Sequence, residues 1–131
     1  MTAANWAPGE LRLIDAAGEL RIAARRADGS LARQVPIWVV CAGDQVYVRT
    51  WYRRDTGWYG RVRDTGRAAV EVPGLRAAVT VHDVGAGPER TRIDAAYRAK
   101  YGRYGDSAVG PMVTDAAAAT TLRLGPERRS A

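Results

Sequence analysis

Residues 33–62 read RQVPIWVVCAGDQVYVRTWYRRDTGWYGRV, and the order of apolar runs and turn signals in this stretch decides the fold. Pro36–Cys41 is apolar and rich in β-branched residues, which indicates a buried strand. Gly43-Asp44 is a turn signal, and Gln45–Tyr52 alternates between two faces. The pattern predicts two antiparallel strands joined by a tight turn, followed by a basic loop and a short helix.

The end of the second predicted strand is the candidate functional site. Arg49 lies on this strand between Tyr47 and Trp51, on the face opposite Val46 and Val48. A guanidinium fork, a hydroxyl group and the free backbone N–H groups of a helix start are donors that suit a phosphate. The strand end and the basic loop after it supply such donors together: Arg49, Thr50, Arg53 and Arg54.

Each of these residues also has a purely structural interpretation. Arg49 and Thr50 could form an exposed strand edge, with the cation stacked on Tyr47 or Trp51. The two arginines of the following loop could simply be solvated. Both interpretations stay open at the level of sequence, because no catalytic motif and no Gly-rich phosphate loop accompany these residues.

The composition describes a globular protein with a basic surface. A chain of 131 residues predicts a single domain over 1–131, with loose ends at 1–7 and 126–131. The net charge of +6 favours an anionic partner, which could be a phosphorylated small-molecule cofactor, a nucleic acid or an acidic lipid. Nineteen arginines against one lysine indicate a compositional bias and carry no recognition signal by themselves.

Several kinds of site are disfavoured by what the sequence lacks. Cys41 is the single cysteine and His82 the single histidine, so we expect no intrachain disulfide and no metal site. No apolar run approaches the length of a membrane span, and the N-terminus has no signal-peptide core. These observations predict a cytoplasmic protein without membrane contact.

The remaining hydrophobic patterns predict an α+β protein that is mainly β. The elements predicted outside residues 33–62 are a helix at 8–17, strands at 19–25, 68–72, 75–84 and 120–124, a helix from Thr91 that Asp94 helps to cap, and an irregular or weakly helical stretch at 107–118. Hairpin connections without βαβ alternation favour a small antiparallel split β-barrel of about six strands with two or three packed helices.

Aromatic residues supply a prediction about assembly. Tyr97, Tyr101 and Tyr104 recur at helical spacing, which indicates a core face or a dimer contact. Four Trp and six Tyr are many large rings for a small barrel, whose interior holds only a few layers of side chains. Because exposed rings are costly unless a partner covers them, we expect a homodimer whose contact includes Trp51, Tyr52 and Trp58. The alternative is a monomer in which these rings pack inward under the short helix.

After the first predicted helix, the chain contains in order Arg33-x-x-Pro36-Ile37-Trp38, Gly43-Asp44, Val46–Thr50 and Trp58-Tyr59-x-Arg61-Val62. This order resembles the flavin- and deazaflavin-binding split-barrel superfamily, which includes pyridoxamine-phosphate oxidases and deazaflavin-dependent reductases. Four motifs are also similar to those of an uncharacterised family of short split-barrel proteins: Pro-Ile-Trp at 36–38, Tyr-Val-Arg-Thr at 47–50, Asp-Ala-Ala-Tyr-Arg-Ala-Lys-Tyr at 94–101 and Thr-Leu-Arg-Leu-Gly-Pro at 121–126. The joint order of the motifs carries this resemblance, which covers nearly the whole chain.

The resemblance implies a homodimer that binds FMN or a deazaflavin coenzyme in a groove near the subunit interface. It implies these cofactor-binding residues: Arg49, Thr50, Arg53 and Arg54 at the phosphate, and Pro36, Ile37, Trp38 and Trp51 near the ring. An oxidoreductase of this type transfers a hydride between the cofactor ring and a small molecule, so it needs few catalytic side chains. The alternative is a non-catalytic basic module for nucleic acid or another anion, with bases stacked on residues 49–54.

Overall fold

The structure is a computed structural model, and it describes residues 5–50 and 57–127. Its strands are β1 (Leu20–Ala24), β2 (Val35–Ile37), β3 (Val40–Ala42), β4 (Gln45–Val48), β5 (Arg67–Val72), β6 (Leu75–Asp83) and β7 (Leu122–Pro126). Its helices are α1 (Pro8–Ala16), α2 (Gly57–Thr65), α3 (Arg90–Tyr101), α4 (Asp106–Val109) and α5 (Asp115–Ala118), with 3₁₀-helical turns at Gly102–Tyr104 and Gly110–Met112.

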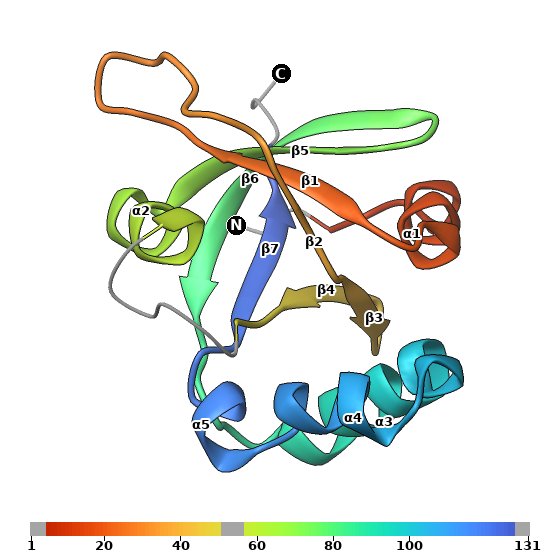
Figure 1. The fold of residues 1–131 in the computed structure, drawn as a ribbon. Helices are drawn as coiled ribbons and strands as arrows, with labels where there is room; N and C mark the ends of the chain where they lie inside the picture. The colour runs from red at the N-terminus through yellow and green to blue at the C-terminus, as the bar shows by residue number, and fades with distance from the viewer. Residues whose placement is uncertain (1–4, 51–56, 128–131) are drawn as a thin grey trace.

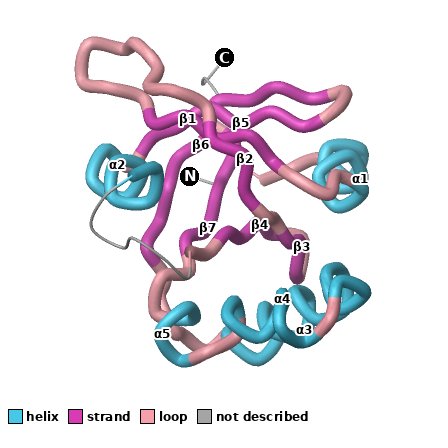
Figure 2. The backbone as a smooth tube through the Cα atoms, viewed as in Figure 1, coloured by secondary structure: helices cyan, strands magenta, loops and turns pink. Residues whose placement is uncertain are grey.

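The seven strands of the described residues form one antiparallel sheet in the order β2-β1-β5-β6-β7-β4-β3 (Figure 1; Figure 2). The two edge strands, β2 and β3, are consecutive in the chain and are separated by Trp38 and Val39 alone. The sheet therefore curls until its edges meet at this link. No ladder joins β2 to β3 within the described ranges, so the barrel is split there. The predicted class, a mainly β protein with a small antiparallel split barrel, is confirmed.

The number of elements differs from the expectation for two local reasons. The strand predicted at 36–41 is two strands because the chain bends at Val39, whose N–H and C=O lie 3.0 and 3.1 Å from the Tyr101 hydroxyl. The stretch predicted as irregular or weakly helical at 107–118 instead holds most of α4 and all of α5, and each of these helices is four residues long. The described chain thus has seven strands and five α-helices. The sequence predicted about six strands and two or three helices.

Helices cover the barrel on three sides (Figure 1). α3, α4 and α5 form one helical layer, and α3 packs against β3. α1 and α2 lie on opposite sides of the barrel in this view, and α2 packs against β1, β5 and β6. In the part of the chain that is described, no helix has the length and hydropathy needed to span a bilayer.

Two apolar clusters hold the barrel and the helical layer together. The larger cluster fills the barrel and includes the fully buried Ile22, Val46, Val48, Leu122 and Leu124. The smaller cluster joins the outer face of β3 and β4 to α3 and includes Val40, Tyr47, Ile93, Tyr97 and Tyr101. Neighbouring side chains of β4 therefore enter different clusters, which confirms the alternation predicted for this strand.

The turn between β3 and β4 confirms the signal at Gly43-Asp44. Both residues have positive φ, 57° at Gly43 and 65° at Asp44. A two-residue hairpin of this kind needs left-handed backbone at both central positions, which Gly and Asp adopt more readily than other residues.

The chain ends within the described residues are attached to the barrel. Trp6 is buried, and its indole N–H donates to the Leu124 carbonyl at 2.8 Å. Pro126 lies in β7, and the Glu127 N–H donates to the Ala78 carbonyl at 2.8 Å. The rest of the predicted loose ends, at 1–4 and 128–131, falls outside the described residues.

Candidate functional site

Arg49 directly follows β4 and lies between the barrel and the helical layer. Its side chain has an exposed fraction of 0%. Nε donates to Thr121 Oγ1 at 2.9 Å, and Nη1 donates to the Asp94 carboxylate at 2.6 Å and to the Met112 carbonyl at 2.8 Å. The guanidinium carbon also lies 5.3 Å from the centroid of the Tyr97 ring. The alternative of an exposed strand edge is therefore wrong.

Asp94 is the counter-charge of Arg49 and not the helix cap suggested by the sequence. α3 begins at Arg90, so Asp94 lies one turn inside the helix. Its second carboxylate oxygen accepts from Arg90 Nε at 3.3 Å, and Arg90 Nη1 reaches Asp115 at 2.7 Å. A row of alternating charges thus connects the end of β4 with α3 and α5.

Thr50 is buried beside Arg49, with an exposed fraction of 6%. Its backbone N–H donates to Thr120 Oγ1 at 3.0 Å, and the Thr120 hydroxyl lies 2.9 Å from the Thr50 carbonyl. This reciprocal contact continues the pairing of β4 and β7 beyond the end of the ladder. A ligand that used the Thr50 backbone would have to break it.

Two buried polar atoms at this junction have no hydrogen-bond partner among the residues that the structure describes: Arg49 Nη2 and the Tyr97 hydroxyl. Burial raises the pKa of Tyr97 far above its ordinary value, and the Arg49 charge opposes this shift. Buried atoms of this kind are commonly satisfied by an internal water. Nη2 is thus the one nitrogen of Arg49 left for another oxygen, and it lies beneath the surface.

Trp38, at the link between β2 and β3, begins an aromatic stack. Its ring is parallel to that of Tyr101, with centroids 4.0 Å apart and an angle of 2° between planes. Tyr104 lies 6.1 Å from Trp38 and is 53% exposed. The predicted tyrosine stripe therefore divides, with Tyr97 and Tyr101 in the core and Tyr104 on the surface.

A groove of about 840 Å³ runs beside this stack. The residues that line it include Pro36, Trp38, Tyr104, Arg21, Glu71 and the Pro73-Gly74 turn. Sites for small molecules typically measure about 300–1,000 Å³. Hydrogen bonds from Gln34 and Arg76 hold the pKa of Glu71 below its ordinary value, so the groove contains a charged carboxylate opposite Arg21.

The predicted ring-binding residues divide between two faces. Pro36 is exposed and Trp38 half-buried, and both line the groove. Ile37 is 9% exposed and belongs to the barrel core. The alternation of β2 thus places Ile37 away from the groove.

Among the residues that the structure describes, Arg49 is not part of the groove that Trp38 lines. The rings of Tyr97 and Tyr101, 6.2 Å apart, lie between them. Neither Arg49 nor Thr50 lines the groove beside Trp38. The burial of Arg49 also removes it from the nucleic-acid platform predicted at 49–54. Trp51, Arg53 and Arg54 lie outside the described residues, and their roles stay predictions.

The motif at 94–101 attaches the helical layer to the barrel through polar contacts that the sequence analysis missed. Lys100 Nζ donates to the Val39 carbonyl at 2.9 Å and to the Ile14 carbonyl at 3.4 Å, and burial lowers its pKa. The Tyr101 hydroxyl also donates to the Gly18 carbonyl at 2.9 Å. One signal was available, because Asp94 shares a helix face with Tyr97 and Tyr101, and a carboxylate on an apolar face needs a cation.

The other side chains that could react or bind a metal, Cys41 and His82 among them, do not form a second candidate site in the described residues. Burial raises the pKa of the Cys41 thiol to about 11, which keeps it protonated and unreactive at neutral pH. His82 is exposed, and its Nε2 lies 3.3 Å from the Thr80 hydroxyl. Across residues 5–50 and 57–127, no three His, Cys, Asp or Glu side chains are grouped to hold a metal ion.

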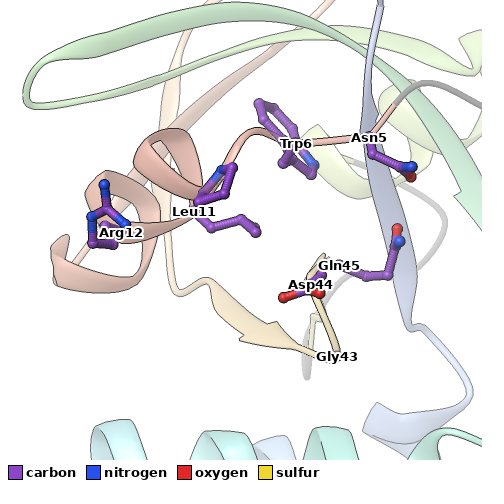
Figure 3. Close-up of a pocket in the computed structure, with 8 residues that line it drawn as sticks. Asn5, Trp6, Leu11, Arg12, Gly43, Asp44 and Gln45 are labelled. Atoms are coloured by element: carbon purple, nitrogen blue, oxygen red, sulfur yellow. The ribbon is translucent and has the colours of Figure 1, made fainter.

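Figure 3 shows a second cavity, of about 520 Å³, between the N-terminal segment, α1 and the β3–β4 turn. The amide groups of Asn5 and Gln45 lie on the side away from Arg12. Arg12 and Asp44 contribute charges of opposite sign.

The fold and the groove define the class: a split-barrel protein with a small-molecule-sized groove beside an aromatic stack. The chain belongs to the family described as "Uncharacterized protein conserved in bacteria (DUF2255)", whose sequence profile matches residues 10–124. No curated protein matches the sequence.

Solved structures with similar folds include three that cover nearly the whole chain. The conserved hypothetical protein Rv2991 from Mycobacterium tuberculosis is 15% identical, with a TM-score of 0.58, over 99% of this chain and 85% of that one. A FAD-binding protein (mll6688) from Mesorhizobium loti is also 15% identical, with a TM-score of 0.58, over 98% and 95%. An F420 reductase is 17% identical, with a TM-score of 0.54, over 94% and 97%. The TM-scores show a shared fold, so the split-barrel fold that the resemblance implied is confirmed.

Proposed function

We propose that this protein binds a flavin-type cofactor, FMN or a deazaflavin coenzyme, with the ring in the groove beside Trp38. The observation that carries the proposal is that Trp38 lines this groove while its ring is supported by the parallel ring of the buried Tyr101, with centroids 4.0 Å apart. Planar rings stack favourably on aromatic side chains. Similarity of fold to a FAD-binding protein and to an F420 reductase supports the same assignment.

The residues beside the groove suit the ring end of such a cofactor. Pro36 and Trp38 supply apolar surface, and the exposed Tyr104 supplies a ring at the rim. Arg21, paired with Pro36 across the β1–β2 ladder, supplies N–H donors for a ring carbonyl oxygen. Together they bind, orient and shield one face of a planar ligand.

Of the four residues predicted to contact the phosphate, the proposal gives Arg49 and Thr50 a different role from Arg53 and Arg54. Arg49 is buried and paired with Asp94, so we assign it a positioning role: it fixes α3, which carries the Tyr101 ring that supports Trp38. Thr50 shares this buried junction. The proposal leaves direct contact with the phosphate to Arg53 and Arg54, on the strength of the sequence pattern.

A bound cofactor would supply hydride transfer to or from a small organic molecule, while the protein supplies orientation and a dry wall. The proposal includes a homodimer in which a second subunit covers the exposed aromatic surface, and a cytoplasmic location. The aromatic content and the absence of apolar spans from the sequence support these two points.

Titration of the purified protein with FMN and with deazaflavin coenzyme tests the proposal, together with an absorbance spectrum of the protein as isolated. We expect saturable binding of one cofactor, weakened about tenfold or more when Arg53 and Arg54 are both changed to alanine. Failure of both cofactors to bind at high micromolar concentration would rule the proposal out.

A further inference from the structure

We propose a second ligand site, for a compact phosphate-type dianion, between the β1–β2 loop and α2. A cavity of about 570 Å³ lies there, and Figure 1 shows the loop and the helix on the same side of the barrel. Three arginines line the cavity, Arg26 and Arg33 from the loop and Arg61 from α2. None of them lines the groove beside Trp38, so this site does not depend on the proposed flavin function.

The loop holds the Arg26 guanidinium in place. Asp28 Oδ1 accepts the backbone N–H of Ser30 at 2.9 Å and its hydroxyl at 2.6 Å, which closes a tight turn. Arg26 Nη1 then donates to the Ser30 hydroxyl at 3.3 Å and to the Leu31 carbonyl at 2.9 Å. One nitrogen is used in this way, and the rest of the planar guanidinium stays available at a defined position.

The other two arginines bring unused donors. Arg33 and Arg61 are exposed, and in the described part of the chain neither guanidinium group makes a hydrogen bond or an ion pair. They belong to segments 28 positions apart in the sequence, so only the fold brings them to one cavity. A ligand that contacts both would close the gap between the loop and the helix.

The charge balance of the cavity favours a dianion. Asp64 is the one carboxylate among its described lining residues; it is 69% exposed, and it already pairs with Arg63 at 3.2 Å. Like charges around a concave surface repel one another, and a bound anion relieves this repulsion. Guanidinium groups match the paired oxygens of a phosphate, so inorganic phosphate or the phosphate monoester of a small metabolite is the ligand class.

Isothermal titration at low ionic strength with inorganic phosphate and with phenyl phosphate tests the site. We expect both probes to bind, and Arg33→Gln and Arg61→Gln each to weaken binding about tenfold. Arg76→Gln is the matched control, because Arg76 is 81% exposed, lies outside this cavity and loses the same charge. Stronger binding of phenyl phosphate would indicate a monoester, and equal binding would indicate the phosphate group alone.

Two outcomes would overturn the inference. One is that neither inorganic phosphate nor phenyl phosphate gives a binding signal with the unmodified protein at millimolar concentration. The other is an equal loss of affinity in Arg33→Gln, Arg61→Gln and Arg76→Gln, which would reveal a general charge effect. Trp38→Leu should leave phosphate affinity unchanged, so failure of the flavin proposal and failure of this site remain distinguishable.

Discussion

The Arg49 guanidinium and the Asp94 carboxylate meet at 2.6 Å, and this ion pair connects the end of β4 to the interior of α3. Arg49 is inaccessible to solvent and the Asp94 side chain is 15% exposed. Removing one partner of a buried pair leaves the other charge uncompensated, which typically costs about 3–5 kcal/mol. We therefore expect Asp94→Ala to lower the free energy of unfolding by about that amount, measured by urea denaturation.

An exposed ion pair provides the control for this prediction. Arg76 and Glu71 lie 3.2 Å apart, but Arg76 is 81% exposed. Pairs of this kind contribute about 0–1 kcal/mol, so Arg76→Ala should leave stability nearly unchanged. A small effect of Asp94→Ala, similar to that of Arg76→Ala, would show that the buried junction does not stabilise the fold.

Gly43 offers a test of backbone strain at the β3–β4 turn. Its φ of 57° lies in the left-handed region, and a Cβ at this position would meet the Arg92 guanidinium. Arg92 is 60% exposed and can move aside, so the expected loss of about 1–2 kcal/mol in Gly43→Ala comes from the backbone. The double variant Gly43→Ala with Arg92→Ala should be no more stable than Gly43→Ala, and restored stability would assign the cost to the side-chain contact instead.

Cys41 gives a prediction about alkaline pH. Burial raises its pKa from 9.0 to about 11, so between these values the folded protein keeps a proton that the unfolded chain has lost. This group therefore stabilises the fold less as the pH rises above 9.0. We expect its rate of reaction with iodoacetamide to keep rising through pH 10 in the folded protein, whereas the urea-unfolded chain reaches a plateau. A plateau at the same pH in both states would contradict this account.

The proposed homodimer is tested by light scattering after gel filtration at low micromolar concentration. We expect a mass twice that of one 14.2 kDa chain, because a second subunit would cover exposed aromatic surface such as Tyr104. A mass of 14.2 kDa that stays unchanged when FMN or deazaflavin coenzyme is added would contradict a groove shared between subunits.

Periodicity and turn signals in the sequence were enough to predict the barrel. The alternation of apolar residues predicts the two faces of β4. The backbone preferences of Gly and Asp predict the Gly43-Asp44 turn and the hairpin connections. The bend at Val39 did not follow, because its backbone groups are satisfied by Tyr101 from a distant helix. A local pattern cannot reveal a contact made 62 positions along the chain.

The candidate site was harder to predict because it depends on which polar groups meet. The sequence predicts Arg49 inside a strand over Gln45–Tyr52, whereas β4 ends at Val48 and Arg49 follows it. The charge of Arg49 is neutralised by Asp94, 45 positions away. Trp38 and Pro36 reach one groove, whereas their neighbour Ile37 faces the core. The three arginines of the second cavity come from separate segments, so no sequence window contains them.

The central claim, that a flavin-type ring lies beside Trp38, is tested most directly by comparing cofactor affinity in Trp38→Leu and Leu31→Ala. Trp38 lines the groove, whereas Leu31, which is 43% exposed, lies between β1 and β2 and not at the groove. Tyr104→Ala, at an exposed position, provides a second groove variant that should fold normally. In fluorescence titrations with FMN and deazaflavin coenzyme, we predict an affinity about tenfold weaker for Trp38→Leu, a smaller loss for Tyr104→Ala and no change for Leu31→Ala. Equal affinity in the unmodified protein, Trp38→Leu and Tyr104→Ala would contradict the account.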